Sequence, residues 1–197
     1  MPTAVLPLTA DSAPNRKRFT RADVNRMQEA GLFEGQRFEL IDGDLIDKMG
    51  QKPPHATGVR RVHVWLAKIF GVDLVQMQLP IDVAVEDREL NEPEPDVTVL
   101  VEDKTDFTRR HPRGDETLLV VEVADSSIRQ DTVRKRDLYA RAGVPEYWIL
   151  NIQDRELIVH RGVHEGRYRE ILTLSEGSFI SPVSRPGALA GIDTLLP

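Results

Sequence analysis

Apolar and polar residues alternate in short periodic runs that predict a series of helices and strands. Residues 21–30 are expected to form a short helix, since Thr20 and Asp23 make a start that resembles a capping box. The next run, RFELIDGDLIDKM, alternates on both sides of Asp42-Gly43, a dipeptide typical of a type I′ turn. The first part of the chain therefore predicts a helix followed by a β-hairpin.

A longer helix and a series of strands follow the hairpin. Val59, Val62, Leu66 and Ile69 recur at helical spacing and predict an amphipathic helix that carries His55 in its first turn. Six apolar runs then predict strands, of which the strongly apolar third is expected at the centre of the sheet: LVQMQLPIDVAV, VTVLV, TLLVVEVA, EYWIL, ELIVHR and YREILTL.

A third helix is expected between TLLVVEVA and EYWIL, capped by Ser126 or Ser127 and ended by Gly143. The order helix, hairpin, helix, strands, helix, strands predicts an α/β fold with a mixed central sheet flanked by helices. We expect one domain over residues 19–197 and a flexible arm over residues 1–18.

The composition excludes several classes of site and of protein. The 197 residues contain no cysteine, which excludes disulfides, cysteine-ligated zinc, iron–sulfur clusters and a thiol nucleophile. Hydrophobic residues make up 40% of the chain, and no stretch approaches the roughly 20 apolar residues that span a bilayer. The N-terminus lacks the pattern of a secretory signal, so we expect a cytoplasmic protein without a membrane partner. A net charge of −6 excludes a generally basic nucleic-acid coat, so DNA contacts would need a local basic patch.

Two acidic residues in apolar surroundings are the first candidates for chemistry. Glu122 follows four consecutive apolar residues, and Asp96 precedes the VTVLV run, 26 positions earlier. Buried carboxylates are costly unless they are paired or bind a metal. If the two strands are neighbours, both carboxylates lie at one end of the sheet and offer the hard oxygen ligands that Mg²⁺ prefers.

The helix after Glu122 supplies a candidate cation. At about 100° per residue, Lys135 lies at the centre of a sector that also holds Leu138 and Tyr139, so it faces the sheet. A cation there needs a carboxylate partner, for which Glu122 is the natural candidate. The alternative is that Lys135 reaches past the helix edge and pairs with Asp131 at i,i+4.

These residues lie in segments that resemble a known family. RFELIDGDLIDKM, His55 opening a helix, Pro95-Asp96 before a strand, LLVVEVADSS and DTVRKRDLYARAGVPEYWIL are similar in order and spacing to the Uma-type family of restriction-endonuclease-like proteins, in the PD-(D/E)XK nuclease superfamily. The resemblance extends from about Phe19 to the C-terminus. It implies a restriction-endonuclease-like core.

The resemblance also implies roles for particular residues. Asp96 matches the aspartate of the PD motif, and Glu122 matches the acidic residue of the (D/E)XK motif. The lysine of that motif would fall two residues after Glu122, where this chain has an alanine. In the family this lysine lies in the following helix, and Lys135 is the matching position. Glu39 matches an acidic residue from the early part of the fold, and His55 matches a histidine close to the metal.

The activity implied is that of a metal-dependent endonuclease that hydrolyses DNA phosphodiester bonds. The ligands of Mg²⁺ or Mn²⁺ would be Asp96, Glu122 and the carbonyl of Val123, with Glu39 and His55 as further ligands or orienters. Lys135 would orient the attacking water and offset charge on the phosphate, leaving a 5′-phosphate product.

Two other interpretations stay open. The displaced lysine is compatible with a nuclease-like fold that has lost catalysis and serves as a binding or assembly module. A phosphoesterase acting on RNA or branched DNA is the other. Cutting both strands of a duplex is simplest with two copies of the site, which favours a homodimer.

Local basic clusters are the candidates for contacts to DNA phosphates. Solvated surface arginines are the alternative interpretation of each cluster. The residues concerned are Arg60, Arg61, Arg109, Arg110, Arg134 and Arg136.

Overall fold

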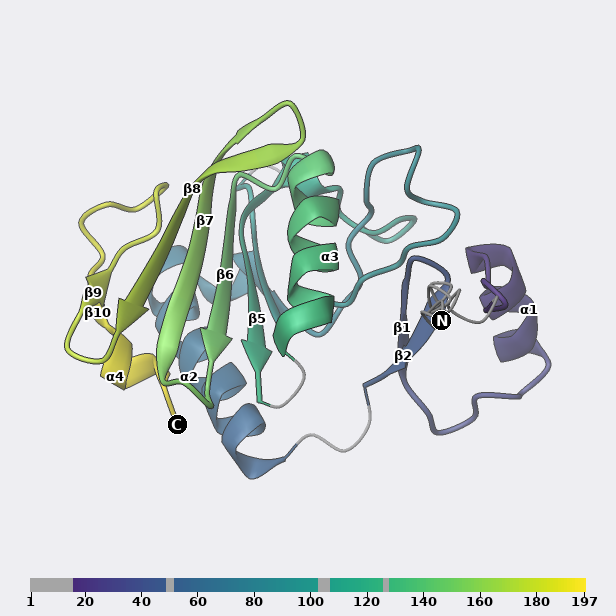
Figure 1. Ribbon diagram of the computed structural model, residues 1–197, viewed down its shortest axis with the longest axis horizontal. Helices are drawn as coiled ribbons and strands as arrows, with labels where there is room; N and C mark the ends of the chain where they lie inside the picture. Colours follow the sequence, from purple (N-terminus) through teal and green to yellow (C-terminus); the bar gives the residue numbers. More distant parts are fainter. Residues whose placement is uncertain (1–15, 49–51, 103–106, 126–127) are drawn as a thin grey trace, which may run out of the picture.

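A six-stranded mixed sheet forms the centre of the computed structural model, which describes residues 16–48, 52–102, 107–125 and 128–197 (Figure 1). Its strand order is β3-β4-β5-β6-β7-β8; β5 and β6 run parallel, and the other neighbouring pairs run antiparallel. The expected mixed sheet is confirmed. Its strands are β3 (Val75–Met77), β4 (Val97–Leu100), β5 (Thr117–Ala124), β6 (Glu146–Asn151), β7 (Glu156–His164) and β8 (Arg167–Ser175).

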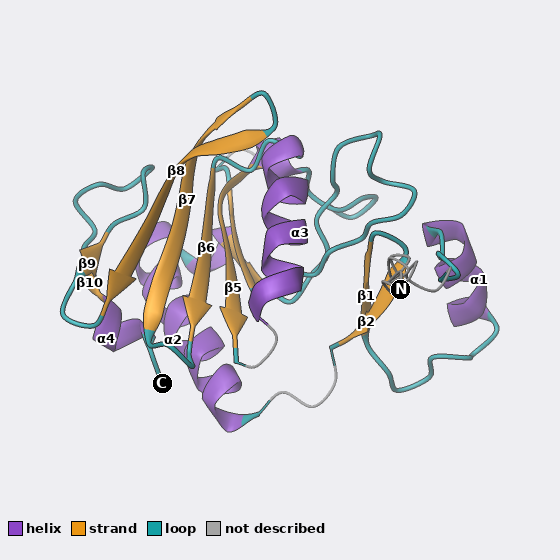
Figure 2. Cartoon of the chain, viewed as in Figure 1, coloured by secondary structure: helices purple, strands orange, loops and turns teal. Residues whose placement is uncertain are grey.

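Two helices cover opposite faces of this sheet (Figure 2). Leu119, Val121 and Val123 of β5 belong to the core under α2 (Pro53–Phe70), whereas Val120 packs with Tyr139 of α3 (Ile128–Arg141). Side chains alternate along a strand, so both faces of β5 are buried and the strand reads as a continuous apolar run.

The N-terminal part forms a separate small unit beside α3 (Figure 1). The helix α1 (Arg21–Glu29) starts with the expected capping box of Thr20 and Asp23. The strands β1 (Phe38–Ile41) and β2 (Asp44–Asp47) pair through a turn in which Asp42 and Gly43 have φ of 49° and 79°. Two positive φ values are the signature of a type I′ turn, so this prediction is confirmed.

Short elements complete the chain at the C-terminal side and between strands. The antiparallel pair β9 and β10 and the helix α4 pack at the edge of the core under α2. The short elements are η1 (Val72–Leu74), η2 (Gly114–Glu116), β9 (Phe179–Ile180), β10 (Ala190–Gly191) and α4 (Ile192–Leu195).

The strand predicted over residues 74–85 is wrong beyond Met77. Gln78 has φ of 51°, which turns the chain out of the ladder, and Pro80 has no N–H to donate to it. The N–H of Ile81 instead donates to a loop carbonyl, that of Pro93, at 3.2 Å. Hydrophobic alternation alone therefore overstated the length of β3.

Some predictions fall on residues outside the described ranges. These are most of the arm, residues 1–15, and the caps Ser126 and Ser127. The basic end of the arm is described, and Arg18 Nε donates to the carbonyl of Asp42 at 2.8 Å. Among the described residues, no helix combines the length and apolarity needed to span a membrane.

Candidate active site

Asp96 and Glu122 lie opposite each other across β4 and β5. Val97 pairs with Val121 in the antiparallel register, so Asp96 and Glu122 form the next opposing pair outward. Opposing side chains point to the same face, which along β5 is the face covered by α3. Both residues are buried, with 1% and 7% of their surface exposed. The register therefore brings two carboxylates together in the protein interior.

Lys135 reaches these carboxylates from α3. Its Nζ lies 2.9 Å from Glu122 Oε1 and 2.7 Å from Glu39 Oε1. One turn further along the helix, the hydroxyl of Tyr139 donates to the same Glu122 oxygen at 2.8 Å. The other oxygen of Glu39 accepts from the N–H of Glu94 at 3.2 Å. Lys135 faces the sheet and links β1, β5 and α3, whereas the side chain of its alternative partner, Asp131, lies outside the described part of the chain.

Asp96 is held by groups from two other elements. Its Oδ2 accepts from the N–H of Val123 at 2.8 Å and lies 3.2 Å from His55 Nε2. His55 reaches it from the first turn of α2. Gly58, one turn later, lets this helix approach the sheet, because a Cβ there would lie 3.1 Å from Val123 Cγ1. Close packing of α2 on β5 thus places the imidazole beside the aspartate.

The surroundings of Asp96 keep it ionised. Burial would raise the pKa of this carboxyl. The hydrogen bond from His55, the positive charge of Lys48 and the N–H of Val123 outweigh burial and lower the pKa to about 2. Asp96 therefore carries a full negative charge at neutral pH.

Glu122 and Lys135 respond to burial in opposite ways. Burial raises the pKa of Glu122, and the nearby Asp96 and Glu39 raise it further against the opposing charge of Lys135. Burial would lower the pKa of Lys135, but Glu122 and Glu39 hold it above its ordinary value. Lys135 therefore stays charged, and Glu122 takes up a proton more readily than Asp96.

Two polar residues of the site were missed in the sequence. Lys48 follows β2, and its Nζ lies 3.9 Å from Asp96 Oδ1. The amide of Gln78 lies 3.5 Å from the same oxygen. The hairpin contained a signal for Lys48: Glu39 pairs with Ile46, and Lys48 is two residues further along. It therefore shares the face of Glu39.

The donor set fits a hard divalent cation. Glu39, Asp96 and Glu122 outnumber Lys48 and Lys135 by one charge when all are ionised. No three His, Asp or Glu side chains of the described residues converge as a ready-made metal cage. Mg²⁺ commonly uses one or two carboxylates together with water and substrate phosphate, so a two-carboxylate site suffices.

His55 faces Asp96 through its Nε2, and its Nδ1 is buried without a hydrogen-bond partner within the described structure. The imidazole therefore contacts Asp96 through one of its two nitrogens. Its predicted role as a metal ligand stays a prediction.

Most of the arginines predicted to contact DNA are engaged within the chain. Arg110 makes two hydrogen bonds to Glu116, at 2.6 and 2.8 Å, and Arg61 donates to the carbonyl of Leu196. Arg60 and Arg109 are exposed. Further ion pairs of this set are Arg134–Asp44 at 3.1 Å and Arg136–Asp137 at 2.8 Å.

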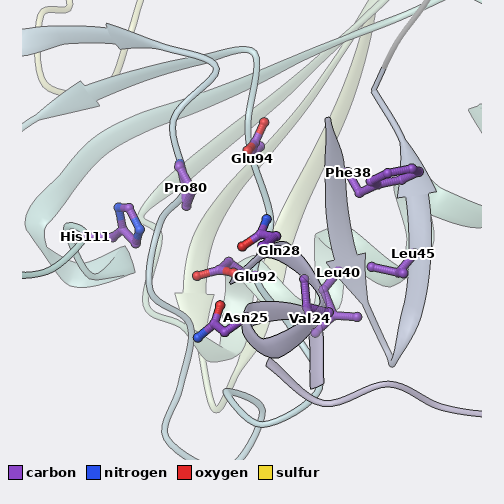
Figure 3. A pocket seen from close by; sticks show the side chains of 10 residues that line it. All are labelled: Val24, Asn25, Gln28, Phe38, Leu40, Leu45, Pro80, Glu92, Glu94 and His111. Carbon is purple, nitrogen blue, oxygen red and sulfur yellow. The ribbon is translucent and has the colours of Figure 1, made fainter. Parts of the chain in front are cut away.

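A hollow of about 240 Å³ lies between α1, the hairpin and residues 80–94 (Figure 3). Phe38 and Leu40 line it together with Glu92 and Glu94. Since Glu39 lies between Phe38 and Leu40 on β1, its side chain points to the other face of the hairpin. The hollow is therefore separated from the carboxylate cluster by β1.

The sheet, its covering helices and the buried acidic cluster define a nuclease-like α/β protein. Its fold is similar to the crystal structure of "a putative nuclease belonging to DUF820" from Anabaena variabilis ATCC 29413, with a TM-score of 0.63 and 15% identity. The similarity covers 80% of this chain and 88% of that chain. Residues 22–189 match the model of the Uma2 family, described as "Putative restriction endonuclease", and the chain belongs to this family. Among curated proteins no match was found. The resemblance noted in the sequence and the restriction-endonuclease-like α/β core are confirmed.

Proposed function

We propose that the protein is a metal-dependent endonuclease that hydrolyses phosphodiester bonds of DNA. The observation that carries the proposal is the meeting of Asp96, Glu122 and Lys135, from two strands and a helix, at one end of the sheet. Membership of the Uma2 family, described as "Putative restriction endonuclease", supports the same activity.

Asp96 and Glu122 would hold Mg²⁺ or Mn²⁺. Val123 donates its N–H to Asp96, and the N–H and C=O of one strand residue project from the same edge, so its carbonyl is available as a third oxygen. When bound, such a cation polarises the scissile phosphate and lowers the pKa of adjacent water. Lys135 fixes the position of Glu122, and His55 fixes that of Asp96.

A nuclease-like module without catalysis is the second candidate, favoured by Ala124 at the usual lysine position. Metal affinity separates the two. An active site is expected to bind Mn²⁺ and to lose it in Asp96→Asn and Glu122→Gln, whereas an inert module would bind equally little in all three proteins.

Plasmid nicking tests the proposal. Wild-type protein should nick supercoiled plasmid with Mg²⁺ or Mn²⁺ and stop when a chelator is added. Asp96→Asn keeps the shape of the side chain and should lose cleavage. Asp73→Ala removes an exposed aspartate of η1 and should cleave like the wild type. Equal nicking by wild type and Asp96→Asn would refute the proposal.

Substrate class and assembly need separate tests. Competition of the plasmid by RNA and by branched DNA tests duplex DNA against the other phosphodiesters. The exposed Arg60 and Arg109 are the arginines whose replacement by alanine should weaken DNA binding and reduce its salt dependence. A homodimer in solution, expected if both strands are cut, is measured by sedimentation.

A further inference from the structure

The two lysines of the site differ in how their charge is used. Lys135 is only 6% exposed, and its ammonium contacts two carboxylates, at 2.7 and 2.9 Å. Two of its three N–H groups are directed to Glu39 and Glu122. A buried ammonium neutralised on two sides has little capacity left for a substrate oxygen.

Lys48 is held more loosely. Within the described residues, its Nζ donates to one neutral acceptor, the carbonyl of Glu94, at 3.1 Å. The nearest carboxylate oxygen of that part of the chain, Asp96 Oδ1, is 3.9 Å away, beyond hydrogen-bond distance. The side chain is 12% exposed against 7% for that of Lys135, so Lys48 lies nearer the surface.

Lys48 also lies on the Oδ1 side of Asp96. The Oδ2 oxygen is occupied by Val123 and His55, so Oδ1 is the oxygen left for a cation and the substrate that it binds. Only Gln78, at 3.5 Å, is closer to that oxygen among the described polar contacts. A phosphate approaching Asp96 Oδ1 through a divalent cation would therefore meet the Lys48 ammonium.

We infer that Lys48 is the catalytic lysine, contacting a non-bridging oxygen of the scissile phosphate, and that Lys135 is a positioning residue. This inference rests on the proposed nuclease function. In the hydrolysis a water oxygen bonds to phosphorus while the P–O3′ bond breaks. The water releases a proton and the 3′ oxygen takes one up. Lys48 offsets the negative charge that gathers on the phosphate oxygens during this exchange.

Cleavage rates and Mn²⁺ affinities of matched variants test the inference. We expect Lys48→Met to cleave about 10²–10³-fold more slowly than wild type, the usual effect of removing one charge-stabilising donor. Its Mn²⁺ affinity should be equal or higher, because a positive charge leaves the neighbourhood of Asp96. Lys48→Arg should recover at least part of the rate, and Lys48→Gln, a polar uncharged variant, should behave like Lys48→Met. Lys68→Met, at an exposed position of α2, should match wild type in both measurements.

The outcomes separate this inference from the function on which it rests. If wild type cleaves, Asp96→Asn does not, and Lys48→Met matches Lys68→Met, Lys135 is the better candidate and only the present inference is refuted. A Lys48→Met protein that loses Mn²⁺ binding together with cleavage would also refute it, because Lys48 would then be building the metal site. A wild type with no metal-dependent cleavage refutes the proposed function and this inference with it.

Discussion

Replacing Lys135 by methionine should destabilise the fold strongly. The ammonium lies 2.7 Å from Glu39 Oε1 and 2.9 Å from Glu122 Oε1 in a buried position. Methionine has a similar length but no charge, so Lys135→Met leaves two buried carboxylates without their cation. Removing one partner of a buried ion pair costs about 3–5 kcal/mol. At about 2–4 °C per kcal/mol for a chain of this size, the Tm should fall by roughly 10 °C.

Thermal and urea unfolding measure this effect, with the exposed Lys68→Met as the control. The pH dependence supplies a second readout. Burial already raises the pKa of Glu122 above 4.5, and loss of Lys135 removes the charge that opposes this. A group with a raised pKa in the folded state contributes stability at low pH that is lost as pH rises. The deficit of Lys135→Met against wild type should therefore shrink as pH falls towards 4.5. A deficit below about 1 kcal/mol at neutral pH, or one that grows on acidification, would refute the buried ion triad.

Two further predictions concern stability elsewhere in the fold. Gly114→Ala would place a Cβ 2.4 Å from the carbonyl oxygen of Ala142, so we expect its free energy of unfolding in urea to fall by about 1–3 kcal/mol. Gly187→Ala is the control, because a Cβ there has no atom within 4 Å, and it should match wild type. Equal stability of the two variants would contradict the packing at Gly114. Burial lowers the pKa of His160 from 6.5 to about 4, so the unfolded chain binds a proton more readily than the folded protein. As pH falls from 6.5 to about 4, the folded protein should therefore lose about 3 kcal/mol of stability. His160→Phe should make the free energy of unfolding less dependent on pH. His164→Phe, at the exposed end of the same strand, should leave that dependence unchanged. If the stability of His160→Phe and of wild type changes with pH in parallel, His160 is not the cause.

Most elements were predictable because short-range sequence determines them. The capping box at Thr20 needs only Asp23 three residues on, and the turn at Asp42 and Gly43 needs only residues that tolerate positive φ. Such features depend on neighbours within one turn or one hairpin. No long-range partner is required to specify them.

The inward orientation of Lys135 could be deduced for a similar reason. The apolar sector of α3 is periodic, so a lysine at its centre faces the sheet whatever the sheet contains. That Glu39 would share this ammonium could not be deduced, because β1 and α3 meet only in the folded chain. The same holds for Arg134, whose carboxylate partner Asp44 lies 90 positions earlier in the chain.

Lys48 and the end of β3 were missed because their positions depend on tertiary structure. Residues 74–85 alternate like a strand, but the partner strand β4 begins at Val97, which pairs with Met77, so the regular ladder stops there. Lys48 follows a short hairpin strand, and only the pairing of this hairpin with the segment around Glu92 and Glu94 brings its ammonium to Asp96.

The role of a lysine in this site depends on which carboxylates its ammonium contacts, not on where the lysine lies in the sequence. Ala124 shares the α3 face with Glu122 by strand alternation, so a lysine there would approach Glu122 from β5 itself. Lys135 reaches the same carboxylate from the helix instead, but this path also brings it to Glu39, and its charge is divided between two acids. Asp96, with a pKa of about 2, is left with Lys48 as its nearest lysine. In the proposed nuclease, a lysine on α3 separates two tasks that one strand lysine would combine: neutralising the buried glutamates and contacting the phosphate. The second task then needs another ammonium on the Oδ1 side of Asp96, and Lys48, which follows the β1–β2 hairpin, supplies it.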